Sequence, residues 1–264
     1  MLYTARLFSV SYQLPNFSTF TNGNFGTKEW RLFFKCLNNS RTVSAWHDIP
    51  RQPAYCSNRD RDHKSDHIFT YVNEIPRGSR AKMELIKEEA YNPIAQDTFN
   101  KAPGCPLRFF SYGNIPFNYG FIPQTWENPD VLDKETKCFG DGDPIDVVQL
   151  GPTPEAIGNF MPVRVLGVLG LIDQNQTDWK IIVEPIAIGG ETYGSLERVP
   201  MEVQRQIVDW FRNYKTTEGK PPNEFVFNAE IRGVETALQI LLNGGNEYEQ
   251  LFSKRIDSHS YWLP

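Results

Sequence analysis

Short runs of hydrophobic residues, several of them alternating with polar ones, dominate the middle of the chain. The main runs, each bounded by glycine, proline or polar residues, are 29–37, 68–75, 82–87, 107–112, 147–150, 164–171 and 180–188. Each run is typical of a β-strand. Pro76 and Gly78 predict a turn that joins 68–75 to 82–87 as a hairpin. Five or more strands of this kind predict a small closed barrel.

Two helices are predicted near the end of the chain. Within 201–215, Val203, Ile207, Phe211 and Tyr214 recur at spacings of four and three, which is the pattern of an amphipathic helix. The second helix is predicted over 234–243, with Gly244-Gly245 as its C-terminal cap. The predicted fold is therefore α+β and mainly β, a closed five-stranded barrel with flanking helices.

The first 28 residues differ from the rest of the chain. They contain no acidic residue, and Arg6 and Lys28 are their only basic ones. We expect residues 1–28 to form an extension that is flexible, covered by a partner, or used for targeting. Residues 29–264 are expected to form a single domain.

Composition excludes several classes of protein. The chain has 264 residues, 40% of them hydrophobic, and a formal net charge of −5. This negative charge argues against binding to the phosphate backbone of a nucleic acid. The apolar runs are too short to span a membrane. Four cysteines without paired spacing argue against a zinc knuckle or a disulfide scaffold.

Three aspartates crowd into the segment 141–146, namely Asp141, Asp143 and Asp146, with no lysine or arginine among them. Two carboxylates about 5 Å apart repel by roughly 3 kcal/mol at an effective dielectric constant near 20, so cations would stabilise the cluster. Oxygen-only sites suit magnesium, manganese or calcium. The alternative is an acidic surface turn without a bound ion, which fits poorly with the hydrophobic run that follows at 145–150. A calcium-binding helix-loop-helix also fails, because Pro152 stands where its bidentate glutamate should be.

Two further pairs place an acid beside a base. Asp173 and Asp178 flank a predicted turn, and strand alternation puts Asp178 on the same face as Lys180. The same alternation puts Lys82 beside Glu84. Acids next to cations suit metal-assisted chemistry on an anion, although each pair alone could be a surface pair.

Taken in order, these segments resemble the soluble family I inorganic pyrophosphatases. The signature Asp-x-Asp-Pro-x-Asp is present at 141–146. Glu-Ile-Pro-Arg-Gly-Ser (74–79), Lys-x-Glu (82–84), Asn-Tyr-Gly (118–120), Thr-Asp-Trp-Lys (177–180) and Tyr-Lys (214–215) accompany it in family order. Segments 44–50 and 123–127 are similar to the eukaryotic branch.

This resemblance implies an oligonucleotide-binding-like barrel that hydrolyses inorganic pyrophosphate to two phosphates with a metal-activated water. It implies that Asp141, Asp146 and Asp178 bind a first metal, that Asp146 bridges to a second, and that Asp173 and Asp178 bind a third. Glu84 would meet a fourth, and Glu74 would organise waters nearby. Asp143 is the implied general base.

The remaining implied site residues are cations and hydroxyls. Those implied to hold the oxygens of pyrophosphate are Lys82, Arg108, Lys180, Tyr214 and Lys215. Tyr119 would hydrogen-bond within the acidic network. The charge developing on a leaving phosphate gives such a clamp its physical reason.

The expected cofactor is Mg²⁺, three to four ions during turnover, with Mn²⁺, Zn²⁺ or Co²⁺ as substitutes and Ca²⁺ as an inhibitor. A homodimer is expected, with a larger homo-oligomer as the alternative. The expected location is the cytoplasm, or else a mitochondrion or an acidic polyphosphate-storing organelle. Two other functions stay open: a two-metal hydrolase of polyphosphate or phosphodiesters, and an inactive calcium-binding barrel module.

Overall fold

The structure is a computed structural model, and it describes residues 12–55, 67–99, 105–186 and 192–264. Its strands are β1 (Tyr12–Gln13), β2 (Phe17–Asn22), β3 (Arg31–Cys36), β4 (Thr42–Val43), β5 (Ala54–Tyr55), β6 (Ile68–Ile75), β7 (Met83–Leu85), β8 (Ile94–Gln96), β9 (Asn118–Phe121), β10 (Phe139–Gly140), β11 (Asp146–Gln149), β12 (Phe160–Asp173), β13 (Gln176–Pro185), β14 (Glu224–Phe225) and β15 (Arg232–Gly233). Its helices are α1 (Met201–Asn213), α2 (Val234–Phe252) and the short 3₁₀ turns η3 (Leu196–Arg198), η4 (Thr216–Glu218) and η5 (Phe227–Ala229).

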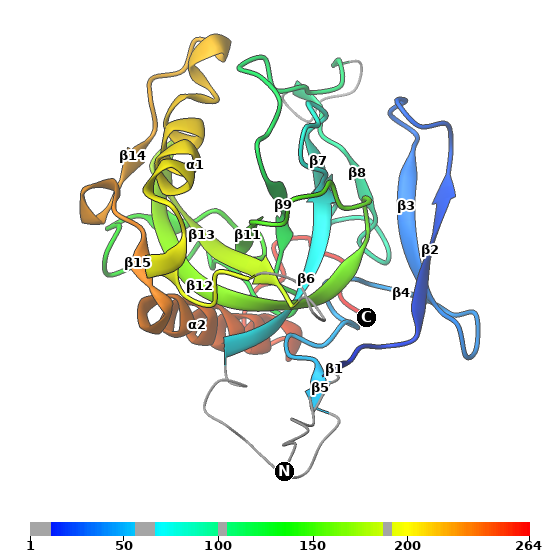
Figure 1. Cartoon of the computed structure of the whole chain (residues 1–264). Coiled ribbons are helices and arrows are strands. Elements are labelled where there is room, and N and C mark those ends of the chain that lie inside the picture. The colour runs from blue at the N-terminus through cyan, green and yellow to red at the C-terminus, as the bar shows by residue number, and fades with distance from the viewer. Residues whose placement is uncertain (1–11, 56–66, 100–104, 187–191) are drawn as a thin grey trace, which may run out of the picture.

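Five strands close into a ring at the centre of the molecule (Figure 1). Going round the ring, β6 pairs with β9, β9 with β11, β11 with β13, β13 with β12, and β12 with β6. Of these five ring pairs, only β11–β13 is parallel. The long hairpin of β12 and β13 turns at Gln174 and Asn175, both with positive φ, which suits the twist of a tight hairpin. The predicted closed five-stranded arrangement is confirmed.

The predicted hairpin between 68–75 and 82–87 is wrong. β7 pairs with β8, in a second sheet with the order β2-β3-β8-β7, and β6 belongs to the ring. All eight residues of β6 are buried, and its two edges are taken by β9 and β12.

The fifth ring strand also differs from the expectation. Segment 107–112 forms only isolated bridges, from Leu107 to Thr98 and from Phe109 to Ala81. The strand that closes the ring is β9, which is only four residues long and contains a glycine, so its sequence signal is weak. The predicted strand 180–188 agrees with β13 up to Pro185, and its last two residues lie outside the described residues.

Both predicted helices are present, but the second is longer than expected. Gly244 and Gly245 are buried inside α2 and do not cap it. A Cβ on Gly244 would lie 2.4 Å from Cδ1 of Ile145, so this glycine allows the helix to pack closely against the segment that leads into β11. Among the described residues, no helix is long and apolar enough to cross a membrane.

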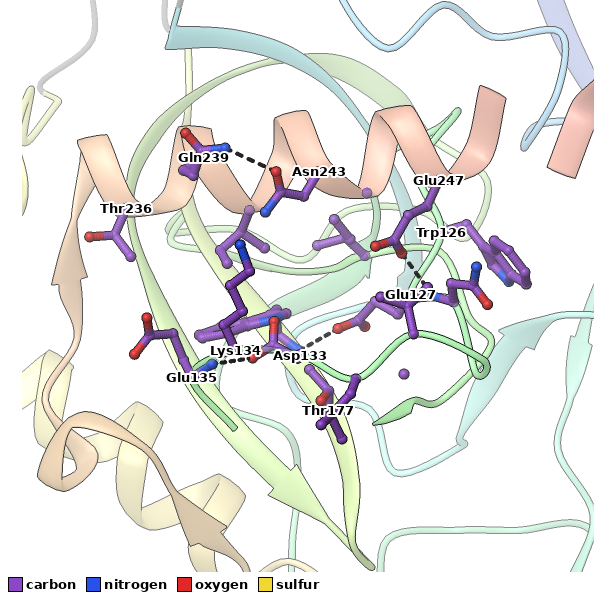
Figure 2. A pocket seen from close by; sticks show the side chains of 18 of the residues that line it. Trp126, Glu127, Asp133, Lys134, Glu135, Thr177, Thr236, Gln239, Asn243 and Glu247 are labelled. Carbon is purple, nitrogen blue, oxygen red and sulfur yellow. Dashed lines mark hydrogen bonds between the residues drawn. The ribbon is translucent and has the colours of Figure 1, made fainter. Parts of the chain in front are cut away.

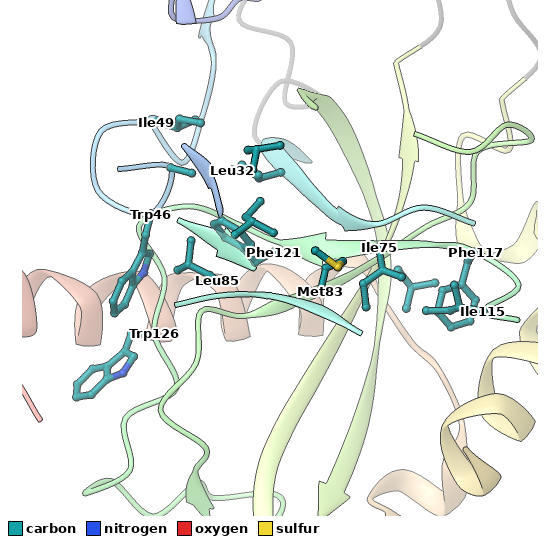
Figure 3. Packing of buried hydrophobic residues seen from close by; sticks show 14 of the residues in the cluster. Leu32, Trp46, Ile49, Ile75, Met83, Leu85, Ile115, Phe117, Phe121 and Trp126 are labelled. Carbon is teal, nitrogen blue, oxygen red and sulfur yellow. The ribbon is translucent and has the colours of Figure 1, made fainter. Parts of the chain in front are cut away.

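A hydrophobic cluster holds the ring against the second sheet (Figure 3). Trp46 and Trp126 are completely buried in it, and Phe121 from β9 is 1% exposed. The indole Nε1 of Trp46 donates to the carbonyl of Thr125 at 2.8 Å, and that of Trp126 donates to the carbonyl of Gly142 at 3.1 Å. The core is therefore tied directly to the acidic segment.

Part of the predicted N-terminal extension is folded onto this second sheet. β2 pairs with β3 along its whole length, so the expected boundary at residue 28 falls inside a hairpin. A targeting role for residues 1–28 stays a prediction, and residues 1–11 lie outside the described part of the chain.

Candidate active site

The acidic segment 140–146 lies between β10 and β11 and is held by backbone hydrogen bonds to Glu127. The amide of Glu127 donates to the carbonyl of Asp143, and the amide of Gly142 donates to the carbonyl of Glu127, each at 2.9 Å. A Cβ on Gly140 would lie 2.4 Å from the backbone of Glu127, so only glycine allows this approach. The loop thus fixes the direction in which its aspartates point.

Three carboxylates meet at this loop, and we name Glu127, Asp141 and Asp178 the acidic triad. One oxygen from each lies within 4.8 Å of the others. Burial, and then the neighbouring acids Asp141 and Asp178, raise the pKa of Glu127 well above its usual range. Burial and Asp143 do the same to the pKa of Asp141. Burial is also the main cause that raises the pKa of Asp178 to about 7.

The donor set of the triad fits a hard divalent cation. It consists only of carboxylate oxygens, and Oε2 of Glu127 is buried without a hydrogen-bond partner. Buried polar atoms normally have a partner. A cation would provide one, and it would also offset the repulsion between the acids, which adds to the effect of burial on these pKa values.

Lys180 joins the triad to Asp146 and Tyr119. Asp146 and Lys180 are paired residues on the parallel strands β11 and β13, so their side chains lie side by side. The ammonium group of Lys180 forms ion pairs with Asp146 and Asp178, and it donates to the Tyr119 hydroxyl at 2.8 Å. Burial lowers the pKa of Lys180, but Asp146 and Asp178 outweigh it and raise the pKa well above its usual range. Lys180 therefore stays charged.

A second acid–base group forms where β12 ends and α1 ends. Asp173 is paired with the ammonium group of Lys215, and the Tyr214 hydroxyl donates to Asp173 at 3.2 Å. Oδ1 of Asp173 is buried and has no hydrogen-bond partner. Burial outweighs the attraction of Asp173 and lowers the pKa of Lys215.

The third group lies next to β7 and β8 of the second sheet and includes Glu218 from η4. The ammonium group of Lys82 is 2.8 Å from Glu84 and 3.1 Å from Asp97. Arg108 is 3.1 Å from the same Asp97 and 3.2 Å from Glu218. Two cations are thus held side by side by acids, a suitable arrangement for binding a polyanion.

A small cavity of about 60 Å³ lies where the ring meets the second sheet. Its walls include six of the predicted site residues: Glu74, Lys82, Glu84, Tyr119, Asp143 and Asp146. Glu74 accepts a hydrogen bond from the amide of Leu85 at 2.6 Å, and burial together with Asp146 raises the pKa of Glu74 well above its usual range. Asp143 is the most open of these acids, with 46% of its side chain exposed.

A larger cavity of about 670 Å³ lies on another side of Glu127, between α2 and the segment 126–135 (Figure 2). Gln239, Asn243 and Glu247 line it from α2, and Trp179 lines it from β13. Of the acidic triad, only Glu127 is among its described lining residues. The larger cavity is therefore not where the predicted site residues converge.

The structure adds partners that sequence reasoning missed. Glu127 completes the triad, Asp97 links Lys82 to Arg108, and Lys87 is paired with Asp143. Glu127 follows the apolar Trp126 in the segment 123–127, which was the one available signal, whereas Asp97 stands between the polar residues Gln96 and Thr98. Their distance from the aspartate motif in sequence, 14 residues or more, gives no clue to contact.

The chain is similar to a family model, to proteins of known sequence and to solved structures. The family model described as inorganic pyrophosphatase matches residues 71–249. An inorganic pyrophosphatase of Mus musculus is 39% identical over 235 residues, covering 88% of this chain and 77% of that protein. The mitochondrial inorganic pyrophosphatase 2 of the same organism is 36% identical, covering 89% and 74%. A truncated vacuolar soluble pyrophosphatase of Trypanosoma cruzi, solved with pyrophosphate, superimposes with a TM-score of 0.83 at 31% identity, covering 97% of this chain and 98% of that one.

Proposed function

The chain belongs to the inorganic pyrophosphatase family, and we propose that it hydrolyses pyrophosphate at the acidic triad and the cations around it. The chemistry is that of an inorganic diphosphatase: water adds to one phosphorus, the bond from that phosphorus to the bridging oxygen breaks, and two phosphates result. This family is metal-dependent. The observation that carries the proposal is the acidic triad, three carboxylates that converge in a largely buried place with Lys180 paired to Asp178. Lys82 lines the small cavity together with Asp143 and Asp146, and it shares Asp97 with Arg108.

We propose Mg²⁺ as the physiological metal, three to four ions during turnover. Asp141, Asp146, Asp178, Asp173 and Glu84 would be ligands, Glu74 would order nearby waters, and Glu127 joins the ligand set because of its unpartnered oxygen. When bound, such ions supply charge neutralisation and lower the pKa of a water molecule. Mn²⁺, Zn²⁺ or Co²⁺ would substitute, and Ca²⁺ would inhibit.

The chain's own side chains then have distinct tasks. Asp143, the most exposed acid of the small cavity, accepts the proton of the attacking water. Lys82, Arg108, Lys180, Tyr214 and Lys215 bind phosphate oxygens and stabilise the charge that develops as the bond breaks. Tyr119 donates to Asp146 and receives the hydrogen bond of Lys180, so it fixes the orientation of both.

The decisive experiment compares phosphate release by the wild type and by Asp143→Asn. We expect Asp143→Asn to fold and bind metal but to lose about 10²- to 10⁴-fold in kcat, because the amide keeps the shape and cannot accept the proton. Asp209→Asn, on the exposed side of α1, is the matched control and should keep full activity. Full turnover of Asp143→Asn would refute its role.

Substrate choice separates this function from the alternatives. Pyrophosphate, tripolyphosphate and a dinucleotide phosphodiester should each be tested with magnesium and with chelator. Rapid release from pyrophosphate alone is the expected result. Faster release from tripolyphosphate or the diester would favour a different two-metal hydrolase, and no release from any of them would favour an inactive calcium-binding module.

Assembly and location are proposed on the resemblance to eukaryotic members. We propose a homodimer, with a larger homo-oligomer as the alternative, which light scattering on the purified chain would distinguish. We propose a cytoplasmic location. The mitochondrial name of one relative and the vacuolar name of another make an organelle the alternative.

A further inference from the structure

The chain beyond α2 returns to the active-site loop and is fixed there by its backbone. The amide of Trp262 donates to the carbonyl of Lys87 at 2.8 Å. The carbonyl of Trp262 lies 3.1 Å from Nε2 of His47. The amide of Tyr261 closes a turn with the carbonyl of Ser258 at 2.8 Å. These contacts hold Tyr261 in one place although it is three residues from the last residue of the sequence.

Lys87 connects this C-terminal segment to the loop of aspartates. Its ammonium group donates to the carbonyl of Gly142 at 2.7 Å and is paired with the carboxylate of Asp143. Only 8% of the Lys87 side chain is exposed, and the side-chain amide of Asn92 donates to the backbone carbonyl of Lys87 at 2.8 Å. Both ends of Lys87 are therefore held, and it bonds to two consecutive residues of the loop.

Tyr261 packs against both Lys87 and Gly142. The ammonium nitrogen of Lys87 lies 5.0 Å from the centre of the Tyr261 ring. A Cβ on Gly142 would come within 2.6 Å of the Tyr261 hydroxyl, so the ring covers this residue closely. The ring also meets the indole of Trp126 edge-on at 6.2 Å, and that indole donates to Gly142.

We propose that Tyr261 is a positioning residue for hydrolysis, which acts on Asp143 by fixing Lys87 and Gly142. The inference rests on the proposed role of Asp143. Gly142 has φ 81°, in the left-handed region where glycine has the most freedom, so the loop needs an external support at this point. The Tyr261 ring supplies that support by contact with Gly142, and the Lys87 ammonium group supplies it by a hydrogen bond to the Gly142 carbonyl.

The effect of removing the ring is expected in kcat. Hydrolysis slows steeply when the loop that carries the proton acceptor moves, since a misplacement of about 1 Å lowers the rate by as much as 10²-fold. We expect Tyr261→Ala to lower kcat roughly 10-fold, with KM changed less than about twofold, because the phosphate-binding cations do not contact Tyr261. Tyr261→Phe keeps the ring and should restore most of the rate.

The test is a double-mutant cycle with Lys87→Met. If Tyr261 acts through Lys87, the double variant should lose little more kcat than Lys87→Met alone. Phe252→Ala is the matched control, because its ring packs on His47 and Tyr248, and it should keep the wild-type kcat. Circular dichroism and melting curves would check folding, and Tyr261→Leu would replace Tyr261→Ala if the latter did not fold.

Three results would overturn this proposal: an unchanged kcat in Tyr261→Ala, a loss in Phe252→Ala as large as in Tyr261→Ala, or strictly additive losses in the cycle. Each is distinct from failure of the proposed function. That function fails if the wild type does not hydrolyse pyrophosphate or if Asp143→Asn stays fully active.

Discussion

His47 makes the stability of this protein depend on pH in a direction that can be measured. The imidazole is 5% exposed, with Nδ1 2.9 Å from the Tyr248 hydroxyl and Nε2 3.1 Å from the carbonyl of Trp262. A carbonyl can only accept, so Nε2 carries the proton and Nδ1 accepts from Tyr248. Burial lowers the pKa of His47 from its ordinary 6.5 to about 4, although the bond to Trp262 opposes this. The ring is therefore neutral in the folded protein at neutral pH.

The magnitude follows from that difference. Well above pH 6.5 His47 is neutral in both the folded and the unfolded chain, so its protonation does not affect the free energy of unfolding. As the pH falls from 6.5 towards 4, only the unfolded chain takes up the proton, so stability is lost. At about 1.36 kcal/mol per pKa unit the full loss is about 3.4 kcal/mol, of which about 2 kcal/mol is reached by pH 5.

The assay is urea unfolding of the wild type and of His47→Gln at pH 7 and pH 5. The variant should be less stable at pH 7 by about 1–3 kcal/mol, because a buried hydrogen bond to Tyr248 is lost. Its drop in stability between pH 7 and pH 5 should be smaller than the wild-type drop by about 2 kcal/mol, since glutamine does not titrate. The buried acids titrate in both proteins and cancel in this comparison. Equal drops in the two proteins would refute the assignment of a neutral, acid-sensitive His47.

Three further outcomes are expected. Magnesium should raise the melting temperature of the wild type by mass action, and it should raise that of Asp178→Asn less, because this variant lacks one charge of the acidic triad. Equal shifts in the two proteins would contradict a metal site at the triad. Calcium added at fixed magnesium should slow phosphate release, after correction for calcium pyrophosphate, because calcium accepts a looser shell at about 2.3–2.6 Å than magnesium at about 2.0–2.1 Å; full activity with calcium alone would overturn this. Gly120→Ala should lower the free energy of unfolding in urea by about 3 kcal/mol or more, because a Cβ there would lie 1.9 Å from the carbonyl oxygen of Val72. A loss below about 1 kcal/mol would show that β6 and β9 can separate easily.

Local patterns in the sequence determined the elements whose signal lies within a few residues. β6 has the predicted bounds because its continuous hydrophobic run fits a strand buried along its whole length. α1 begins at Met201, where the predicted helix begins. The aspartates of 141–146 predict a cation site, because three negative charges within six residues repel one another unless a cation is bound. The order of short motifs along the chain identified the family.

Tertiary structure decided which elements meet, because a strand's pattern states how it is buried and not which strand lies next to it. The same alternation in 82–87 fits a hairpin with β6 and the observed pairing with β8. Gly244 carries the signal of a helix cap, but α2 continues through it to Phe252, and the missing side chain of Gly244 lets α2 pack closely against Ile145. Glu127, Asp97 and Lys87 reach the site from distant positions, and only the closed ring and the sheet beside it bring them to the aspartates.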